Sequence, residues 1–550
     1  MTLKELFDNS CTQYANRSAI SYVNGNPLTY AEMKQEVTQT TALLCRMGIC
    51  KGDRVAILSS NQPNWCITFF AVTCMGAIAV PILPDFHPDE VKNILLHSGS
   101  KAIFVSQKFT ESVAGLANET LTHVVLMDDF SLISGELTEA QDISWEAPVE
   151  SDTASIIYTS GTTGRSKGVM LSHLNITSNA EACMQIEYVV PEDVFLSILP
   201  LSHSYENTIA FIMPIMQGSS IYYLDKPPTP AVLIPALQKT RPTIMFSVPL
   251  IIEKIYRSQV QAKFTQSKLL KLIYEHVILF RKLVHYLAGK KLNKTFGGRM
   301  RFFGIGGAKL DATVERFLSE ARFPYAIGYG LTETSPLIAG SNPAHTCFQG
   351  IGPVLKGVQV KIDTSDPHKG IGEVLVKGPN VMQGYYREPE LTRNQFTEDG
   401  WLRTGDLGHF DRHMRLYLKG RQKNMIVGAN GENIYPEDIE AVINNIRGVL
   451  ESLVLEKKGK LVAMVCLNIE ELEKSYLQLR NNTIQFIAVK KEGLGKQKEE
   501  WNKHLEAYIS ELKNHVNRRL NRFSQIHSVI VVPVPFQKTP TMKIKRYLYQ

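Results

Sequence analysis

Residues 159–168 of this 550-residue chain read Thr159-Ser-Gly-Thr-Thr-Gly-Arg-Ser-Lys-Gly168. They follow Ala154-Ser-Ile-Ile-Tyr158, a short apolar run of the kind found in buried strands. The glycines of the stretch, Gly168 included, let the backbone approach an anion, its hydroxyl groups donate hydrogen bonds, and Lys167 adds a positive charge. We therefore expect a polyphosphate-binding loop after a strand. The residues expected to contact the anion are Thr159, Ser160, Gly161, Thr162, Thr163, Gly164 and Lys167.

The loop differs from the Walker A pattern of P-loop NTPases. That pattern requires Gly, four residues and then Gly-Lys-Ser/Thr, whereas Lys167 is followed here by Gly168 and the apolar Val169-Met-Leu171. A stretch rich in Ser, Thr and Gly is also typical of an ordinary surface turn. The loop alone leaves both interpretations open, and the rest of the chain decides between them.

The composition indicates a soluble protein with more than one domain. Apolar residues make up 44% of the chain and charged residues 21%, as in globular proteins, and 550 residues exceed what one core usually supports. The first residues include acidic side chains, and no run reaches the roughly 18 apolar residues that span a bilayer. The eight cysteines form no Cys-x-x-Cys pair, which favours reduced, packed thiols. We expect a cytoplasmic protein.

Positive charge is concentrated between residues 251 and 300. This segment contains eleven Lys or Arg residues and only two acidic residues, Glu253 and Glu275. Apolar residues from Leu269 to Leu287 recur in it at helical spacing. This pattern predicts a basic amphipathic helix. Two interpretations stay open: a helix packed on its domain with its lysines in water, or a peripheral contact with the anionic inner face of a membrane. No recognised nucleic-acid-binding module accompanies the charge, so we expect no nucleic-acid partner.

Short apolar runs alternate with helix-sized segments through the first four hundred residues. The runs are 54–58, 102–105, 124–127, 156–158, 244–248 and 300–303. The alternation predicts an α/β fold with parallel strands and crossover helices. Beyond Gly350, the runs 358–362 and 372–376 place β-branched residues between glycines, which predicts a smaller antiparallel or barrel-like element.

The last 130 residues predict a separate, small α+β domain. Residues 436–443 have the pattern of a helix with proline in its first turn, and 450–455 and 461–466 have that of strands. The polar run 490–503 predicts a solvated loop that leads into a helix over 504–520.

Five further motifs follow the loop along the chain. They are Phe302-Phe-Gly-Ile-Gly-Gly-Ala-Lys309, Ile327-Gly-Tyr-Gly-Leu-Thr-Glu-Thr334, Gly400-Trp-Leu-Arg-Thr-Gly-Asp-Leu407, Lys419-Gly-Arg-Gln-Lys-Asn-Met425 and Lys538-Thr-Pro-Thr-Met-Lys-Ile-Lys-Arg546. In this order and spacing the chain, from about Leu3 to Lys545, resembles the adenylate-forming superfamily of acyl-CoA synthetases, peptide-synthetase adenylation domains and firefly luciferase. The resemblance implies an AMP-binding adenylation domain at 1–420 and a mobile C-terminal lid at 421–550, with a hinge near Lys423.

The resemblance also implies the activation of a carboxylate by ATP. The α-phosphate and the carboxylate repel each other until Mg²⁺ and lysines neutralise them. By resemblance Thr332 contacts the α-phosphate, Glu333 helps hold Mg²⁺ through a hard oxygen, and Lys543 bridges the carboxylate and α-phosphate oxygens. The neighbouring bases Lys538 and Arg546, together with Lys545, are alternatives to Lys543.

The remaining nucleotide contacts are assigned in the same way. Gly306-Gly307-Ala308 lines the adenine slot, where small residues admit a flat ring, and Tyr329 stacks on the base. Asp406 accepts hydrogen bonds from both ribose hydroxyls, and Arg421 reinforces the ribose and phosphate contacts. Taken alone, the glycines are also compatible with a plain turn, and Asp406 with a helix cap.

The resemblance also assigns three positions to a second half-reaction, in which a thiol takes the acyl group from the adenylate. His203 is placed near the carboxylate and the pantetheine channel, although a lone histidine often has only a packing role. Lys423 matches the hinge about which the small domain rotates, and Gly431 lies on the lid face that admits the thiol.

Ser166, in the phosphate loop, departs from the family pattern, which commonly has proline before the lysine.

The implied function is that of an AMP-forming acid:CoA ligase that uses ATP, Mg²⁺ and CoA. Within the superfamily the chain is most similar to bacterial long-chain fatty acyl-CoA synthetases, through the insertion 259–296, Leu201-Ser-His-Ser-Tyr-Glu-Asn207 and Gly431-Glu-Asn-Ile-Tyr-Pro436. One alternative is acyl transfer to the phosphopantetheine of a carrier protein. Another is a catalytically silent, membrane-associated acyl-binding homologue, and luciferase-type oxidation is a remote third.

Overall fold

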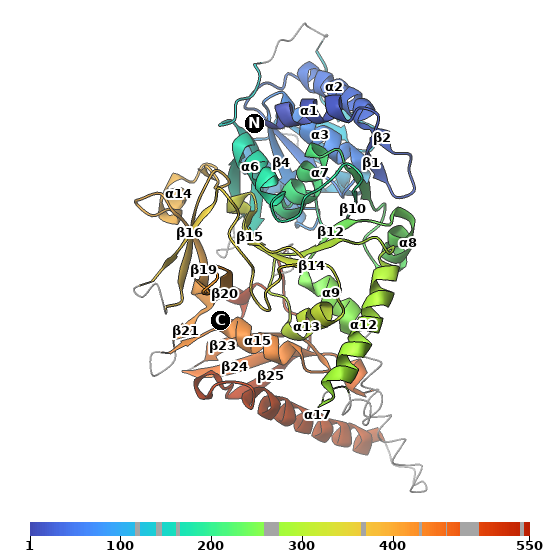
Figure 1. Ribbon diagram of the computed structural model, residues 1–550. Helices are drawn as coiled ribbons and strands as arrows, with labels where there is room; N and C mark the ends of the chain where they lie inside the picture. The colour runs from blue at the N-terminus through green and yellow to red at the C-terminus, as the bar shows by residue number, and fades with distance from the viewer. Residues whose placement is uncertain are drawn as a thin grey trace. The chain divides into compact units, whose positions relative to one another are not determined.

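The computed structural model of the chain is drawn in Figure 1. It describes residues 1–115, 121–138, 146–160, 166–257, 274, 276–364, 370–427, 432–457, 459–473, 494–539 and 544–550. The chain divides into two compact units. The first contains Met1–Asp363, Val374–Thr404 and His409–Tyr417, and the second contains Thr364–Glu373, Gly405–Gly408 and Leu418–Gln550.

One eight-stranded sheet of the first unit carries the phosphate loop. Its order is β18-β9-β8-β4-β3-β5-β6-β7. The strands β8, β4, β3, β5 and β6 are parallel, whereas β18, β9 and β7 are antiparallel to their neighbours. The strand bounds are β3 (Arg54–Leu58), β4 (Ile78–Ile82), β5 (Ala102–Val105), β6 (His123–Leu126), β7 (Leu132–Ser134), β8 (Thr153–Ser160), β9 (Ser166–Ser172) and β18 (Gly384–Tyr385).

The second eight-stranded sheet has the order β15-β14-β13-β12-β10-β11-β1-β2. All neighbouring pairs from β1 to β14 in this order are parallel, and only the end strands β2 and β15 run antiparallel. The strand bounds are β1 (Ser18–Tyr22), β2 (Leu28–Thr29), β10 (Val194–Ser197), β11 (Ser220–Tyr223), β12 (Ile244–Ser247), β13 (Phe302–Ile305), β14 (Tyr325–Gly330) and β15 (Leu337–Gly340). The predicted parallel α/β architecture is confirmed.

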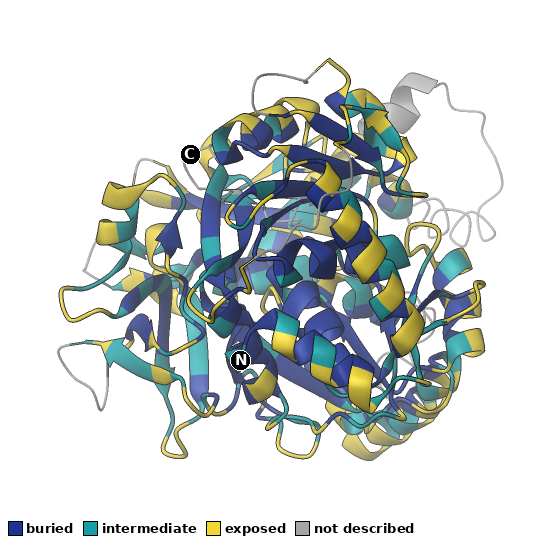
Figure 2. Ribbon diagram, turned by 90° about the horizontal axis from the view of Figure 1, so that it is seen from above, coloured by how far each residue is buried: buried dark blue, intermediate teal, exposed yellow. Residues whose placement is uncertain are grey.

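Helices connect and cover these strands. The helices and helical turns of the unit are α1 (Leu3–Gln13), α2 (Tyr30–Arg46), α3 (Pro63–Cys74), α4 (Pro88–Ser98), η1 (Gln107–Phe109), α5 (Thr110–Val113), α6 (His173–Cys183), η2 (Glu206–Ile212), α7 (Met213–Met216), α8 (Pro230–Thr240), α9 (Pro249–Tyr256), α12 (Ile278–Thr295), α13 (Ala312–Glu320), η4 (Thr332–Thr334) and α14 (Pro389–Gln395). Most of them carry exposed residues on one side only, whereas strand residues are mostly buried (Figure 2). No helix in the described ranges has both the length and the apolarity needed to cross a bilayer.

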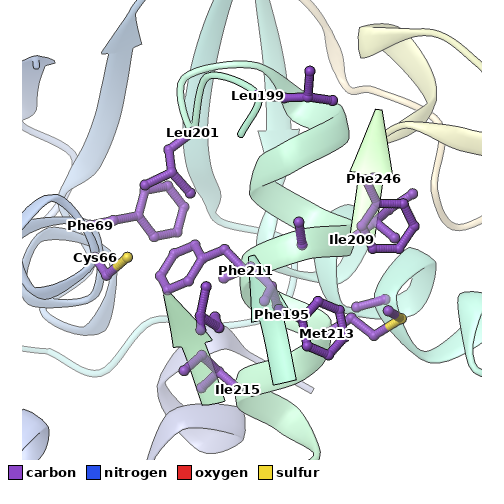
Figure 3. Packing of buried hydrophobic residues seen from close by; sticks show 14 of the residues in the cluster. Cys66, Phe69, Phe195, Leu199, Leu201, Ile209, Phe211, Met213, Ile215 and Phe246 are labelled. Carbon is purple, nitrogen blue, oxygen red and sulfur yellow. The ribbon is translucent and has the colours of Figure 1, made fainter. Parts of the chain in front are cut away.

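The core of the first unit is built around aromatic side chains. Helix α3 is buried on all its faces because its sequence is almost entirely apolar. Phe69 of α3 and Phe211 of η2 meet edge to face with ring centroids 5.8 Å apart, and Phe195 and Phe246 stack on neighbouring strands (Figure 3). This packing fixes η2, a π-helical turn, between α3 and the second sheet.

A four-stranded sheet follows along the chain, as the change of pattern beyond Gly350 predicts. Its order is β16-β17-β19-β20. The strand bounds are β16 (Gln359–Asp363), β17 (Gly372–Lys377), β19 (Leu402–Phe410) and β20 (Leu416–Arg421).

The second unit has its own α+β core, as predicted. In its three-stranded sheet, β23 (Val449–Lys457) is antiparallel to β24 (Lys460–Leu467), which is parallel to β25 (Ser528–Val532). The short strands β21 (Ile426–Val427) and β22 (Asn433–Ile434) pair, and 3-10 turns η5 (Gln422–Asn424), η6 (Arg522–Ser524) and η7 (Arg546–Leu548) complete the unit. Helices α15 (Pro436–Asn444) and α17 (Leu494–Asn517) supply Ile439, Ile443, Leu512 and Val516 to the core.

The predicted loop over 490–503 is wrong from Leu494 onward. Helix α17 begins there, ten residues before the predicted start. The run is rich in Lys, Glu and Gln, which are strong helix formers, so a polar sequence here is compatible with a helix.

Candidate active site

The predicted phosphate loop joins two paired strands. Thr159 at the end of β8 pairs with Lys167 in β9, and Ser160 pairs with Ser166. The Ser166 hydroxyl donates to the Glu90 carboxylate, which ties this end of the loop to α4. Gly161, Thr162, Thr163 and Gly164 lie outside the described residues. The structure therefore places both ends of the loop on one β-hairpin.

Gly168 has a packing role that the sequence does not predict. It lies inside β9 opposite Tyr158, and a Cβ atom there would come within 2.8 Å of the Ile156 Cγ2 atom. Tyr158 is itself held by a 2.7 Å hydrogen bond to His97 Nδ1. The glycine makes room for cross-strand packing. That it also lets the backbone approach the phosphate stays a prediction.

Lys167 and Glu333 meet on one tyrosine. The Lys167 ammonium lies over the face of the Tyr385 ring, 5.2 Å from its centroid, and the Tyr385 hydroxyl donates to Glu333 Oε1 at 2.9 Å. Tyr385 reaches this position because β18 pairs with β9, with Tyr385 opposite Val169. The lysine expected to bind phosphate and the carboxylate expected to bind Mg²⁺ are thus brought together.

The sequence motifs do not point to Tyr385. It stands in a Gly-Tyr-Tyr run that has no recognisable chemical signature, more than two hundred residues after the loop. Only the pairing of β18 with β9 places it there. An aromatic residue after a glycine was the single available signal, and it is a weak one.

The turn that carries Thr332 and Glu333 is held on both sides. Leu331 N–H donates to the Thr334 hydroxyl at 3.0 Å, and Met382 N–H donates to the Glu333 carbonyl at 2.9 Å. Asn380 Nδ2 donates to the Thr334 carbonyl at 2.9 Å. Because its backbone is fixed, Glu333 keeps its carboxylate beside Tyr385.

The adenine-slot residues lie at one edge of the second sheet. Gly306-Gly307-Ala308 follows β13, and Tyr329 lies in the neighbouring parallel strand β14. Gly306 N–H donates to the Ser247 carbonyl at the end of β12 at 3.1 Å, and Gly307 has a φ of +85°, which favours glycine. The carboxyl ends of adjacent parallel strands therefore converge here, where α/β proteins bind ligands.

The segment around His203 contacts the same edge. Ser204 Oγ lies 3.5 Å from Thr332 Oγ1, and the Tyr205 ring lies so close to Gly306 that a Cβ there would be 3.1 Å from Tyr205 Cζ. His203 is half-buried, and its Nδ1 accepts from Tyr205 N–H at 3.3 Å. The structure thus brings the His203 segment to the predicted α-phosphate and adenine residues.

An apolar cavity lies beside this segment. Its volume is about 40 Å³. Tyr205, Ile209 and Met213 line one wall. Phe246 of β12 also lines the cavity and lies near Ile209 (Figure 3). The other walls come from strands β13, β14 and β15 and from the end of α6.

Three glycines line the strand wall of the cavity. A Cβ atom on Gly304 would lie 2.5 Å from Phe246 Cδ1, one on Gly328 would lie 2.9 Å from Leu337 Cδ1, and one on Gly340 would lie 2.8 Å from Ile186 Cδ1. None of the three has the positive φ that would require glycine. Their missing side chains therefore set the width of the cavity, a role that the sequence alone does not reveal.

The predicted ribose contacts pair within the second unit. Arg421 Nε donates to Asp406 Oδ1 at 2.8 Å, with Asp406 in β19 and Arg421 at the end of β20. Asp406 is buried, whereas Arg421 is exposed. Lys423 follows directly in the short turn η5 and is exposed. Gly431 and Lys543 lie outside the described residues.

A magnesium ion would have a single carboxylate in the first unit, Glu333. The part of the chain that the structure describes contains no cluster of three or more His, Cys, Asp or Glu side chains fit to hold a metal. Mg²⁺ in nucleotide sites commonly takes one or two carboxylates and completes its shell with phosphate oxygens and water. Glu333, half-buried beside the lysine of the phosphate loop, fits that mode.

Comparisons with known proteins give a consistent family. Residues 7–386 match the model of the AMP-binding enzyme family. The chain is 29% identical to long chain acyl-CoA synthetase 7, peroxisomal, of Arabidopsis thaliana, over 94% of this chain and 79% of that protein. It is 28% identical to the long-chain-fatty-acid–CoA ligase FadD15 of Mycobacterium bovis, over 94% of this chain and 90% of that protein.

Two further similarities extend over nearly the whole chain. The long-chain-fatty-acid–[acyl-carrier-protein] ligase AEE15, chloroplastic, of Arabidopsis thaliana is 26% identical over 98% of this chain and 84% of its own length. The crystal structure of ATP-bound MatB from Rhodopseudomonas palustris shares the fold, with a TM-score of 0.75 and 24% identity over 100% of this chain and 98% of that one. Because the family match spans well over half of its residues, the chain belongs to the family of AMP-binding enzymes.

Proposed function

We propose that this protein is an ATP-dependent, AMP-forming ligase that joins a long-chain fatty acid to CoA. The observation that carries the proposal is the meeting of Lys167 and Glu333 on Tyr385, with Thr332 next to Glu333 in the same turn. A phosphate-binding cation, a magnesium-binding carboxylate and a hydroxyl donor are what in-line attack on an α-phosphate requires. Relatives named as long-chain acyl-CoA synthetases support the substrate class.

The first half-reaction joins the fatty acid to AMP. A carboxylate oxygen attacks the α-phosphorus, and pyrophosphate leaves. Lys167 binds the departing phosphates, Thr332 donates to the α-phosphate, and Lys543 lies against the oxygens that develop charge in the transition state. Mg²⁺ held by Glu333 neutralises phosphate charge when it is bound.

The second half-reaction transfers the acyl group. The CoA thiol attacks the acyl carbon, the bond to AMP breaks, and the second unit changes its position about Lys423 between the two reactions. Asp406 and Arg421 bind the ribose, and Gly431 lines the path of the thiol arm. His203 lies near the carboxyl group that reacts in both steps.

The apolar cavity suits the acyl chain. It begins at the Tyr205 side, next to the residues expected around the α-phosphate, and its walls are almost entirely apolar. Each buried methylene contributes about 0.8 kcal/mol, or roughly fourfold in binding. A chain that fills the cavity therefore gains affinity stepwise with its length.

Pyrophosphate release across a panel of saturated acids, with and without CoA, tests this function. We expect release to require both ATP and an acid, and kcat/KM to rise roughly fourfold for each added methylene until the cavity is full. Best activity on acetate or benzoate would contradict the long-chain assignment and leave the ligase assignment in place.

The similarity to the acyl-carrier-protein ligase supports a second candidate acceptor. CoA and the carrier protein present the same phosphopantetheine thiol, so the acyl-AMP chemistry is common to both. Incubation of enzyme, ATP and palmitate with each acceptor separates them. We expect thioester formation with CoA, and preference for the carrier protein would contradict the CoA assignment.

We further propose that this cytoplasmic enzyme contacts an anionic membrane surface through α12. The leucines 279, 283 and 287 lie one helical turn apart and are 81%, 56% and 56% exposed. Lys282, Lys290, Lys291 and Lys294 flank them, and the helix contains no acidic residue. Exposed leucines framed by lysines suit insertion among anionic head groups. The part of the predicted apolar pattern that precedes residue 274 lies outside the described residues.

Sedimentation with vesicles tests the membrane contact. We expect binding to vesicles that contain phosphatidylserine, weaker binding to pure phosphatidylcholine and loss of binding at high salt. Replacing the three leucines by serine should abolish it, whereas the same change at exposed Leu96, Ile133 and Ile234 should not. Binding that is indifferent to the α12 changes would refute the contact.

A further inference from the structure

Two ion pairs hold the C-terminal segment of the second unit. Arg546 Nη2 donates to Glu440 Oε2 at 2.5 Å, and the Lys538 ammonium pairs with the Glu451 carboxylate. Both carboxylates are largely buried, with 11% and 12% of their side chains exposed. Val454 N–H donates to Glu440 Oε1 at 2.7 Å, and its carbonyl accepts from Arg546 Nη1 at 3.3 Å. The segment is thereby tied to both α15 and β23.

Further contacts join the two sides of positions 540–543. Lys538 and Ile544 form an antiparallel bridge, and Lys545 N–H donates to the Gln537 carbonyl at 2.9 Å. The rings of Phe536 and Tyr549 meet edge to face, with centroids 5.0 Å apart. The residues before and after positions 540–543 are therefore held to each other, while those four positions lie outside the described residues.

These ion pairs bear on which base acts in acyl-AMP formation. Lys538 and Arg546, which the sequence leaves as alternatives to Lys543, each bind a buried carboxylate. Taking a base out of such a pair leaves a largely buried charge without its partner, which is strongly destabilising. Both bases are therefore committed to holding the segment.

We propose that Glu440 and Glu451 are positioning residues for acyl-AMP formation. By holding Arg546 and Lys538, they fix the two ends of the segment that carries Lys543. The inference rests on the proposed function, in which Lys543 serves acyl-AMP formation and not thioester formation. It predicts that loss of either carboxylate impairs the first half-reaction selectively.

The test measures both half-reactions of Glu440→Gln. Glutamine still accepts from Val454 N–H but cannot neutralise Arg546. We expect pyrophosphate release without CoA to fall about tenfold or more, and thioester formation from synthetic acyl-AMP and CoA to change less than about twofold. Glu451→Gln, at the other end of the segment, should likewise lower pyrophosphate release and spare thioester formation. It replaces the first variant if Glu440→Gln folds poorly. Equal loss in both half-reactions would overturn the proposal.

A double variant shows whether Glu440 acts through Lys543. Lys543→Ala alone should reduce acyl-AMP formation about a hundredfold or more, and adding Glu440→Gln should reduce it no further. Losses that multiply would overturn the proposal. Glu471→Gln is the matched control, since Glu471 pairs with Arg447 at the surface of the same unit at 3.1 Å and should leave both half-reactions unchanged. If Lys543→Ala spares acyl-AMP formation, the proposed role of Lys543 fails first, and the inference fails with it.

Discussion

Tyr385 contacts two residues that belong to different sequence motifs. Its ring faces the Lys167 ammonium, and its hydroxyl donates to the Glu333 carboxylate. The ring needs no hydroxyl to attract a cation, whereas the contact with Glu333 depends on it. The two contacts can therefore be separated by mutation.

Tyr385→Phe should weaken the orientation of Glu333 and leave the ring under Lys167. Loss of one hydrogen bond to a charged group costs about 1.5–3 kcal/mol, so we expect kcat/KM to fall roughly 10- to 100-fold, with a higher magnesium requirement. Pyrophosphate release measured over a range of Mg²⁺ concentrations checks this. Tyr386→Phe, next in the chain, is the control, and an unchanged magnesium requirement in Tyr385→Phe would count against the role of Glu333.

Glu206 is a buried carboxyl group, and within the described ranges it forms no ion pair. It is 1% exposed at the start of η2, and Ser197 Oγ donates to its Oε1 at 2.5 Å. Burial raises the pKa of Glu206 to about 8. The folded protein therefore keeps this group largely protonated at neutral pH, next to the apolar core.

Glu206→Gln should remove a pH-dependent loss of stability. In the unfolded chain the pKa of this group is about 4.3, so the folded state binds the proton more tightly. Its stabilisation is complete below about pH 4.3 and is lost as pH rises through about 8. We expect the free energy of unfolding, measured with urea, to fall between about pH 5 and about pH 8.5. The fall should be larger in the wild type than in the variant by on the order of a few kcal/mol. Glu192→Gln, at an exposed side chain, is the control, and parallel pH profiles would refute the prediction.

At the scale of elements, strands β12 and β13 form part of the cavity wall. Gly304 of β13 leaves the space that the Phe246 ring of β12 occupies. Phe246 also packs against Tyr205, with ring centroids 5.7 Å apart. A side chain added at Gly304 would therefore displace this ring, which lines the cavity.

Gly304→Ala should therefore shorten the preferred acid. The added methyl group lies 2.5 Å from Phe246 Cδ1, too close for the ring to stay where it is. We expect the chain-length optimum to move down by about two to four carbons, at roughly fourfold in kcat/KM per methylene lost. The double variant Gly304→Ala/Phe246→Leu should restore longer acids. An unchanged optimum in both would show that the acyl chain binds elsewhere.

At the scale of the whole molecule, the residues predicted to bind the substrates belong to two compact units. The phosphate loop, the Thr332-Glu333 turn and the cavity lie in the first, and Asp406, Arg421 and Lys423 lie in the second. The expectation of a mobile lid at 421–550, hinged near Lys423, stays a prediction. It requires the backbone at Lys423 to change its dihedral angles between half-reactions.

Lys423→Pro tests the hinge because proline fixes φ near −65°. We expect single-turnover pyrophosphate release to survive and thioester formation to fall by at least about tenfold. Lys423→Ala, which keeps the backbone free, should retain both reactions. Survival of both half-reactions in the proline variant would move the hinge to another position.

The sequence by itself determined the fold class and most of the expected site. Apolar runs of strand length separated by helix-sized segments specify parallel α/β layers, because burial periodicity is a local property of the chain. The motifs around Lys167, Gly306 and Thr332 are local in the same sense, since each is a continuous stretch of about ten residues or fewer at the end of a strand. Local patterns were therefore sufficient to anticipate them.

Only the tertiary structure decided the contacts between distant segments. Tyr385 joins Lys167 to Glu333 because β18 pairs with β9 in one particular register, and Gly168 packs across its hairpin for the same reason. The buried pair of Glu440 and Arg546 joins residues more than a hundred positions apart. Strand register and the packing of elements depend on the whole core, and a shift of one residue along β18 would turn Tyr385 to the opposite face of the sheet.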